Sequence, residues 1–215
     1  FSTTSGLRVR LEYPGSVFQL MTTDSRTVYN TSFANGLFSV KTLEGEPTIV
    51  TNSTAGCTSG VGLLSVSFKH VPVSANISIT IVCASSVSVT AHPFPTFSGS
   101  NAMTASTLAP FAGSGVYQQA KLATVLHFTD SSSQVVTTAG PTSYTVLNPG
   151  TAVVNNSVVS VAGAIVSKVD PGLTGTVDIS AAFLNIVTLT PFSLTVTDTP
   201  VDLTEIRASG AFPST

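Results

Sequence analysis

Residues 77–81, Ile77-Ser78-Ile79-Thr80-Ile81, and residues 192–196, Phe192-Ser193-Leu194-Thr195-Val196, share one pattern of alternating apolar and hydroxyl side chains. Alternation with a period of two is typical of a half-exposed β-strand. The two stretches begin 115 residues apart, at Ile77 and at Phe192. A strand that recurs at a fixed distance indicates an internal repeat, which decides how the rest of the sequence is interpreted.

The same offset of 115 residues relates further parts of the chain. Leu11-Glu12-Tyr13 resembles Leu126-His127-Phe128, and Gln19-Leu20-Met21-Thr22-Thr23 resembles Gln134-Val135-Val136-Thr137-Thr138. Single matches are Tyr29 with Tyr144, Gly60 with Gly175, Ser65 with Ser180, and Phe68 with Phe183. No gap is needed to align these positions. They predict two copies of one unit of about 115 residues, the size of an immunoglobulin-like (Ig-like) sandwich.

The phase of the repeat predicts the domain boundaries. Residues 1–86 match residues 116–201, so the first copy has no counterpart of residues 87–115. Val201-Asp202-Leu203-Thr204 resembles Val87-Ser88-Val89-Thr90, here at an offset of 114. We expect an Ig-like domain without its first strand over residues 1–86, a complete domain over 87–200, and a C-terminal extension over 201–215.

The composition favours an all-β extracellular chain. Of the 215 residues, 42% are hydrophobic and 8% are charged, with a net charge of −2; about 60 are Ser or Thr. Eight Lys and Arg residues cannot build the basic patch that nucleic-acid binding requires. Low charge with high hydrophobicity excludes a disordered chain. No apolar run reaches the ~18 residues of a membrane helix, so no membrane insertion is expected.

Local patterns place strands and turns within each copy. Residues 7–13 alternate apolar and charged side chains and end at the turn Pro14-Gly15; residues 123–128 are their counterpart. Residues 65–68 and 77–81 predict a hairpin around Val71-Pro72, which residues 184–187 and 192–196 repeat. Residues 87–115 predict a first strand, a polyproline-like corner and a loop. The predicted fold is all-β: two tandem Ig-like β-sandwich domains and a C-terminal strand.

Cys57 and Cys83 are the only cysteines, and they bracket the first predicted hairpin. Antiparallel pairing would place them opposite each other, so we predict a disulfide worth about 3 kcal/mol. The second copy has Gly172 and Asp198 at these positions. The alternative is two free thiols, which a secreted protein disfavours.

Four N-x-Ser/Thr sequons point to glycosylation, at Asn30, Asn52, Asn76 and Asn155. Ser and Thr residues could also carry O-linked glycans. The alternative is unmodified, hydroxyl-rich loops. The sequence begins at Phe1, so a processed protein or a piece of a longer one is expected, from which cleavage could have removed a signal peptide or an anchor. We predict an extracellular or cell-surface location.

One stretch resembles a known family. It runs from Tyr144-Thr145-Val146-Leu147-Asn148-Pro149-Gly150 through Val158-Val159-Ser160-Val161 to Gly172, Gly175 and Thr176-Val177-Asp178-Ile179-Ser180. Its aromatic strand, Asn-Pro turn, Val-rich hairpin and glycine-led strand resemble the bacterial Ig-like (BIG) repeat family, with Tyr144 where the family often has Trp. The resemblance implies extracellular tandem β-sandwiches of adhesins, stalks and fibres, without catalysis. It transfers no ligand residues.

Residues that could carry chemistry are dispersed. None of His70, His92 and His127 has metal-ligand spacing to another ligand. His127 lies near Asp130 and Ser131, but the first copy has Glu12 in its place, so a surface role is favoured over a triad. Asp170, Asp198 and Asp202 are candidate calcium ligands, but calcium usually needs several clustered carboxylates, so solvated loop residues are the better interpretation. We therefore expect no catalytic, cofactor or metal site and no enzyme activity.

Two hypotheses about function follow. In the first, the chain is a structural subunit of a glycosylated extracellular fibre, a homo-oligomer assembled head to tail by β-strand complementation. Residues 201–215 would enter the incomplete first domain of the next molecule, with Val201, Leu203 and Ile206 as inward anchors. In the second, it is a stalk or binding segment of an adhesin that recognises carbohydrate or protein. An exposed aromatic patch would favour the second; most aromatic residues are expected in the core. A third, weaker interpretation is a non-catalytic domain of a secreted hydrolase.

Overall fold

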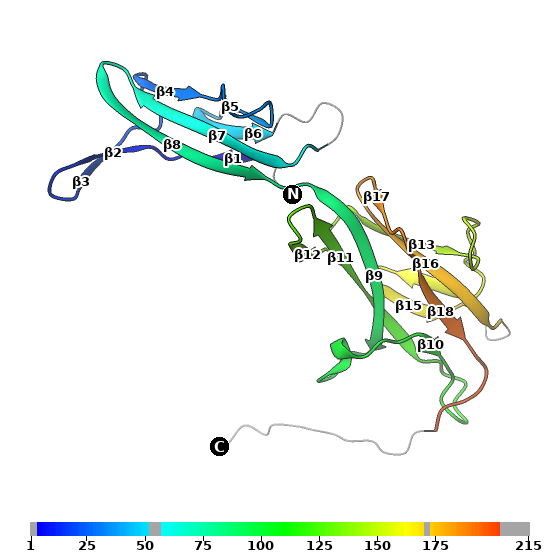
Figure 1. Cartoon of the computed structure of the whole chain (residues 1–215). Helices are drawn as coiled ribbons and strands as arrows, with labels where there is room; N and C mark the ends of the chain where they lie inside the picture. The colour runs from blue at the N-terminus through cyan, green and yellow to red at the C-terminus, as the bar shows by residue number, and fades with distance from the viewer. Residues whose placement is uncertain (1–3, 52–56, 170–172, 203–215) are drawn as a thin grey trace, which may run out of the picture. The chain divides into compact units, whose positions relative to one another are not determined.

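The computed structural model describes residues 4–51, 57–169 and 173–202, to which all structural statements below refer (Figure 1). Its regular elements are β-strands, apart from one 3-10 turn, η1 (Ser100–Ala102). No helix in the described part is long and apolar enough to cross a membrane. The prediction of an all-β fold is confirmed.

The chain divides into two compact units, Phe1–Ala84 and Ser85–Thr215. The strands of the first unit are β1 (Thr4–Gly6), β2 (Arg10–Tyr13), β3 (Val17–Leu20), β4 (Thr27–Asn30), β5 (Phe38–Leu43), β6 (Glu46–Thr51), β7 (Gly60–Phe68) and β8 (Val71–Ile81). The strands that follow are β9 (Ala84–Phe94), β10 (Thr107–Leu108), β11 (Gln119–Phe128), β12 (Ser133–Val135), β13 (Thr142–Leu147), β14 (Val159–Ala162), β15 (Ile165–Lys168), β16 (Gly175–Phe183), β17 (Ile186–Val187) and β18 (Phe192–Val196).

The second unit is a sandwich of two sheets. One sheet has the strand order β12-β11-β15-β14, and β9 also pairs with β11. The other has the order β10-β18-β16-β13, in which β10 runs parallel to β18. Strands of an Ig-like domain are lettered A to G in chain order. Here β9, β11, β15 and β14 correspond to A, B, E and D of one sheet, and β18, β16 and β13 correspond to G, F and C of the other.

Alternating apolar side chains explain why these strands bury one face. Successive side chains of a strand point to opposite faces of the sheet, so every second residue can enter the core. The buried side chains spaced in this way on β9, β11, β16 and β18 are Val87, Val89, Ala91, Leu122, Leu126, Val177, Ile179, Ala181, Phe183, Leu194 and Val196. The core of the second unit therefore includes the inner face of β9.

The first unit contains the sheets β1-β6-β5 and β4-β7-β8, together with the hairpin β2-β3. Its buried core consists of Ala34, Leu37, Phe38, Leu64 and Val66, which come from β5, β7 and the segment before β5. Half-buried side chains, among them Leu7 and Val9, pack against this cluster.

Pairings and side-chain hydrogen bonds of the two units correspond at the offset of 115 residues. Thr27 pairs with Phe68 as Thr142 pairs with Phe183, and Gly60 pairs with Ile81 as Gly175 pairs with Val196. The hydroxyl of Tyr29 donates to the carbonyl of Thr22 at 2.8 Å, and that of Tyr144 donates to the carbonyl of Thr137 at 3.3 Å. Burial raises the pKa of both tyrosines.

The offset changes in one hairpin. The turn between β5 and β6 lies at Glu44-Gly45, whereas the turn between β14 and β15 lies at Gly163-Ala164, 119 residues further along. The expectation of a gapless alignment is therefore wrong for this hairpin. The extra residues lie in the connection from β13 to β14, and surface connections tolerate insertions because few core contacts depend on them.

A close approach at Gly62 gives a test of the core of the first unit. A Cβ atom there would lie 2.6 Å from Cε1 of Phe38 and 3.0 Å from backbone atoms of Ala34. Because backbone cannot move aside, we expect Gly62→Ala to destabilise the first unit by about 1–3 kcal/mol in a denaturant titration. Gly6→Ala is the control, since a Cβ at Gly6 meets nothing within 4 Å. Equal stability of the two variants would contradict this packing.

Candidate functional site: an open edge of the first unit

Two strands of the second unit have no equivalent in the described part of the first. In the second unit, β9 pairs with β11 and β10 pairs with β18. At the offset of 115 residues, β11 corresponds to β1 and β2, and β18 corresponds to the end of β8. Among the described residues, β1 and β8 are edge strands of their sheets, and β2 pairs only with β3. The first unit thus presents open edges where the second unit is closed.

The open edge exposes side chains that the second unit buries. Thr124 and Leu126 of β11 are both 0% exposed. Their counterparts Val9 and Leu11 are only half-buried. Thr188 is buried, whereas its counterpart Val73 on β8 is 48% exposed. Thr124 and Leu126 lie on β11, which pairs with β9, and nothing described pairs with β2 in the place of β9 in the first unit. Thr188 is held by bonds to Ser180 and Ala181.

A groove of ≈ 350 Å³ opens at this edge. Its apolar lining comes from β2 and the residues just before it, from β7 and from β8: Val9, Leu11, Val66, Phe68, Val73 and Ala75. No local sequence motif marks these residues as a site. The repeat contains the signal. In the second copy β9 pairs with β11, and the first copy has the counterpart of β11 but no described counterpart of β9.

Charged side chains of β2 also line the groove. The guanidinium of Arg10 lies 2.7 Å from the carboxylate of Glu12 and 5.5 Å from the centre of the Phe18 ring. Both charged side chains are more than half exposed. In the second unit, His127 occupies the position of Glu12, and its Nε2 lies 2.9 Å from the hydroxyl of Ser88 on β9. Glu12 therefore marks a position that the covering strand contacts in the second unit.

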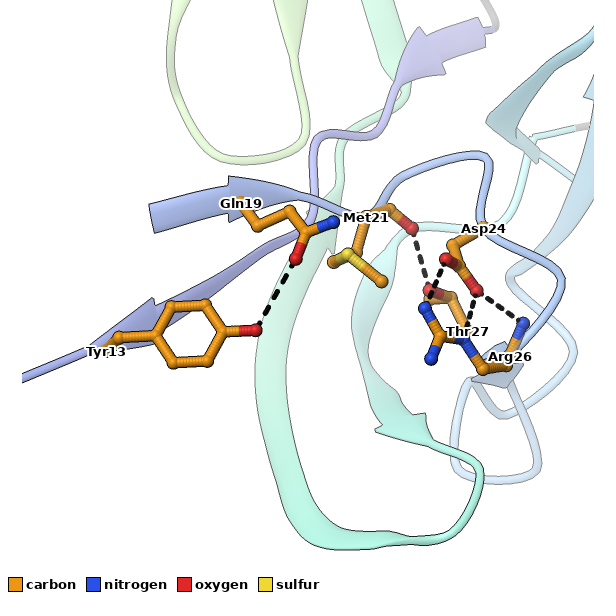
Figure 2. Close-up of polar contacts among 6 residues, drawn as sticks. All are labelled: Tyr13, Gln19, Met21, Asp24, Arg26 and Thr27. Carbon is orange, nitrogen blue, oxygen red and sulfur yellow. Dashed lines mark hydrogen bonds and ion pairs between the residues drawn. The ribbon is translucent and has the colours of Figure 1, made fainter. Parts of the chain in front are cut away.

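The hairpin β2-β3 carries exposed aromatic side chains. Phe18 is 60% exposed and Tyr13 is 47% exposed. A hollow of ≈ 530 Å³ is lined by Arg10, Glu12, Tyr13, Ser16 and Phe18. The exposure of Tyr13 and Phe18 contradicts the expectation that most aromatic residues lie in the core. It arises because β2 pairs with β3 alone in the described part. The hydroxyl of Tyr13 donates to Gln19 at 3.4 Å, across the hairpin (Figure 2).

A polar turn follows the hairpin (Figure 2). Arg26 donates to the Asp24 carboxylate through its backbone N–H, Nε and one terminal nitrogen, each at 2.9 Å. The side-chain hydrogen bond from Arg26, aided by its backbone N–H, lowers the pKa of Asp24 to about 2. Thr27 donates to the Met21 carbonyl at 2.7 Å and so begins β4. Asp24, Thr27, Tyr29, Lys41 and Lys69 help to line a polar hollow of ≈ 620 Å³.

Cys57 and Cys83 form a disulfide, with their Cα atoms 5.6 Å apart. Disulfides persist in oxidising compartments, which supports an extracellular or cell-surface location.

In the second unit, Asp198 stands at the position of Cys83. It accepts a short hydrogen bond from the Tyr117 hydroxyl and lies 3.4 Å from Nζ of Lys168. The Tyr117 hydrogen bond and the Lys168 charge lower the pKa of Asp198.

The predicted glycosylation sites differ in their surroundings. Asn30, at the end of β4, and Asn76, on β8, are exposed. Asn155 is half-buried, and its Nδ2, the atom that would carry a glycan, donates to Asn148 at 2.7 Å. Asn52 lies outside the described residues. Attachment at Asn155 would leave its Nδ2 one N–H, which would have to be the one that donates to Asn148, whereas no such bond of Nδ2 occurs at Asn30 or Asn76 in the described part.

Residues considered for catalysis or metal binding have other contacts. His127 faces Ser88, and Asp130 accepts hydrogen bonds from the backbone N–H and hydroxyl of Ser132. Asp198 binds Tyr117 and Lys168, as described above; Asp170 lies outside the described residues. The described part contains no cluster of three or more His, Cys, Asp or Glu side chains that could hold a metal ion.

Of the predicted inter-subunit anchors, Val201 is described, while Leu203 and Ile206 lie outside the described residues. Val201 bonds within its own unit: its N–H donates to the carbonyl of Pro110 at 2.9 Å, and its carbonyl accepts from the N–H of Ala112 at 3.0 Å. It forms a parallel bridge with Phe111.

Comparisons with protein-family models and with curated sequences find no match. Solved structures give distant similarities. Domains 4–9 of the surface layer protein SbsC match with 9% identity and a TM-score of 0.33, over 94% of this chain and 29% of that one. Domains 6–7 of SbsC match with 13% identity and a TM-score of 0.32, over 93% and 89%. Titin domains z1z2 in complex with telethonin match with 11% identity and a TM-score of 0.26, over 83% and 82%. The chain thus spans less than a third of the first structure, and the fold assignment rests on the strand order.

Removal of the disulfide should affect the first unit alone. The bond joins residues 26 apart, and a loop of this size stabilises the folded state by about 3 kcal/mol in the chain-entropy model. We expect the double variant Cys57→Ala, Cys83→Ala to lower the free energy of opening of the β7 amides by about this amount. The faster hydrogen exchange that results would be measured by peptide mass spectrometry. Amides of β16 serve as the control within the same molecule. Unchanged protection of β7 would contradict a stabilising role.

The Asp24 ion pair predicts a pH dependence. Its pKa falls from 3.8 to about 2 on folding, so its contribution to stability is complete above pH 4 and is lost as the pH falls towards 2. Asp24→Asn keeps an acceptor for the backbone N–H of Arg26 but removes the charge. We expect wild type to have the higher melting temperature above pH 4, and the difference to shrink between pH 4 and 2. A difference that stays constant across this range would contradict the assignment.

Proposed function

We propose that the protein is a structural subunit of a glycosylated extracellular fibre or surface filament, assembled head to tail by β-strand complementation. The observation that carries the proposal is the groove of the first unit. It is apolar and open at the place where the second unit is closed by its own strand β9.

The edge strand β8, whose counterpart β18 is covered by β10 in the second unit, is a second open edge that supports an assembly role. It is 11 residues long, and most of its residues are exposed. Val71, Val73 and Ile77 are its large exposed apolar side chains. A long exposed edge with apolar side chains pairs readily with another strand, and soluble proteins usually cover or charge such an edge. A strand added to it gains main-chain hydrogen bonds, while pockets for alternate side chains provide specificity.

Residues 201–215 are the proposed donor, since the sequence after β18 resembles the start of β9. A donor segment after β18 and an acceptor groove in the first unit form a heterologous contact, which produces open filaments when the rotation does not close a ring. The disulfide and the exposed sequons at Asn30 and Asn76 fit an extracellular, glycan-carrying surface. The resemblance of residues 144–180 to BIG repeats supports the same class of protein.

A second candidate is a stalk or binding segment of an adhesin. The exposed hollow over Tyr13 and Phe18 favours it, because aromatic rings next to Arg10 and Glu12 offer stacking faces and hydrogen-bonding groups to a carbohydrate. In this case the groove would play no part in assembly.

Negative-stain microscopy tests the proposal with three variants. We expect filaments from the wild type, and none after deletion of residues 201–215 or with Val73→Arg, which places a charge in the groove. Val61→Arg is the matched control, since Val61 on β7 is 56% exposed but does not line the groove. It should form filaments. Single particles in every sample, with glycan binding that Phe18→Ala removes, would overturn the fibre proposal in favour of the adhesin.

A further inference from the structure

The second unit shows what the groove requires of its occupant. Val87, Val89 and Ala91 of β9 point into the core, and Ala91 is 0% exposed. The residues between them, Ser88 and Thr90, are not buried. An occupant of the groove therefore needs apolar side chains at every second residue, with a small one at the third inward position and no charge on the inner face.

The residues next to β18 meet this requirement poorly. Val201 is already bonded to Pro110 and Ala112 of its own unit. With Val201 and Leu203 facing inward, Glu205 would take the place of Ala91 and bury a carboxylate against apolar side chains. The strand β9 of a second molecule is also engaged, since Ser85 and Ser88 both contact His127.

The sequence further along fits the groove better. Ile206, Ala208, Gly210 and Phe212 alternate with Arg207, Ser209 and Ala211. If Ile206 takes the place of Val87, Ala208 takes that of Val89 and Gly210 that of Ala91, which supplies the small third residue. Arg207 then takes the place of Ser88. In the second unit Ser88 contacts His127, and Glu12 is the counterpart of His127 in the first unit. The one charged residue of the segment would face an exposed carboxylate on β2.

On this basis we infer that residues 206–212 of a second molecule fill the groove of the first unit, with Ile206, Ala208 and Gly210 inward and Arg207 paired with Glu12. The inference rests on the proposed function and replaces Val201 and Leu203 as anchors. Residues 201–206 would then connect the donor's own unit to its neighbour; a fully extended chain covers about 17 Å over five residues.

Disulfide trapping between two variants, each with one added cysteine, tests the register. The acceptor carries Val73→Cys, and each donor carries one cysteine at a position from 205 to 212; the native disulfide stays in both. Because the new cysteines are on different molecules, any cross-link is intermolecular. We expect the cross-linked dimer to peak at whichever of positions 206, 208 and 210 lies opposite residue 73, with several-fold less from the adjacent positions of the other phase, 207, 209 and 211. Val61→Cys is the control acceptor and should show no such period.

A charge exchange tests the proposed ion pair. Glu12→Arg and Arg207→Glu should each lower the cross-linking yield of the position 208 donor several-fold, and the two variants mixed should restore it. Trapping with the opposite phase, at 205, 207 and 209, would overturn the register while tail-dependent filaments kept the proposed function. A mixture that stays as low as the single variants would overturn the Arg207–Glu12 pair. Absence of trapping at all positions, with filaments that survive deletion of residues 201–215, would overturn both proposals.

Discussion

The edge between the two sheets of a sandwich is the constraint on which the rest of the structure depends. Apolar side chains between the sheets are buried only if a strand closes this edge, because the sheets themselves leave it open to water. In the second unit the strand is β9, which pairs with β11, and Leu126 of β11 is buried. In the first unit β2, the counterpart of the end of β11, pairs only with β3 in the described part, and Leu11 on it is half-buried. The groove and the exposed hairpin β2-β3 lie at this edge, whereas the exposed edge of β8 corresponds to that of β18, which β10 covers in the second unit.

The two units use different chemistry to hold the chain after the last strand. Cys83 in the first unit is bonded covalently to Cys57, whereas Asp198, at the corresponding position, is held by Tyr117 and Lys168. Burial works to lower the pKa of Lys168, but the Tyr117 hydrogen bond and the Asp198 charge outweigh it and raise the pKa. The Tyr117 ring also lies 4.2 Å from the ammonium group. A covalent bond suits the unit with an open edge, because it stabilises a fold that has less buried apolar surface to hold it.

The sequence predicted those features that depend on local pattern. Alternation at residues 77–81 and 192–196 places strands that the structure contains in β8 and β18, and the spacing of Cys57 and Cys83 around a hairpin predicted the disulfide. Features that depend on a missing neighbour were not predictable in the same way. Tyr13 and Phe18 have the pattern of strand residues, and their exposure follows only from the absence of a partner for β2. The bonds of Val201 to Pro110 and Ala112 join residues about 90 apart, and no local motif indicates them.

Glycosylation and strand insertion are compatible in this geometry. Val73, Ser74 and Ala75 of β8 line the groove, and Asn76 is exposed but is not part of this lining. A glycan at Asn76 would be attached to a residue outside the lining of the groove. It would also hinder unspecific pairing between β8 strands of two molecules, because two bulky glycans would meet along the same edge. An edge protected in this way would remain open to a donor strand that enters from the groove side, which is the selectivity that ordered head-to-tail assembly requires.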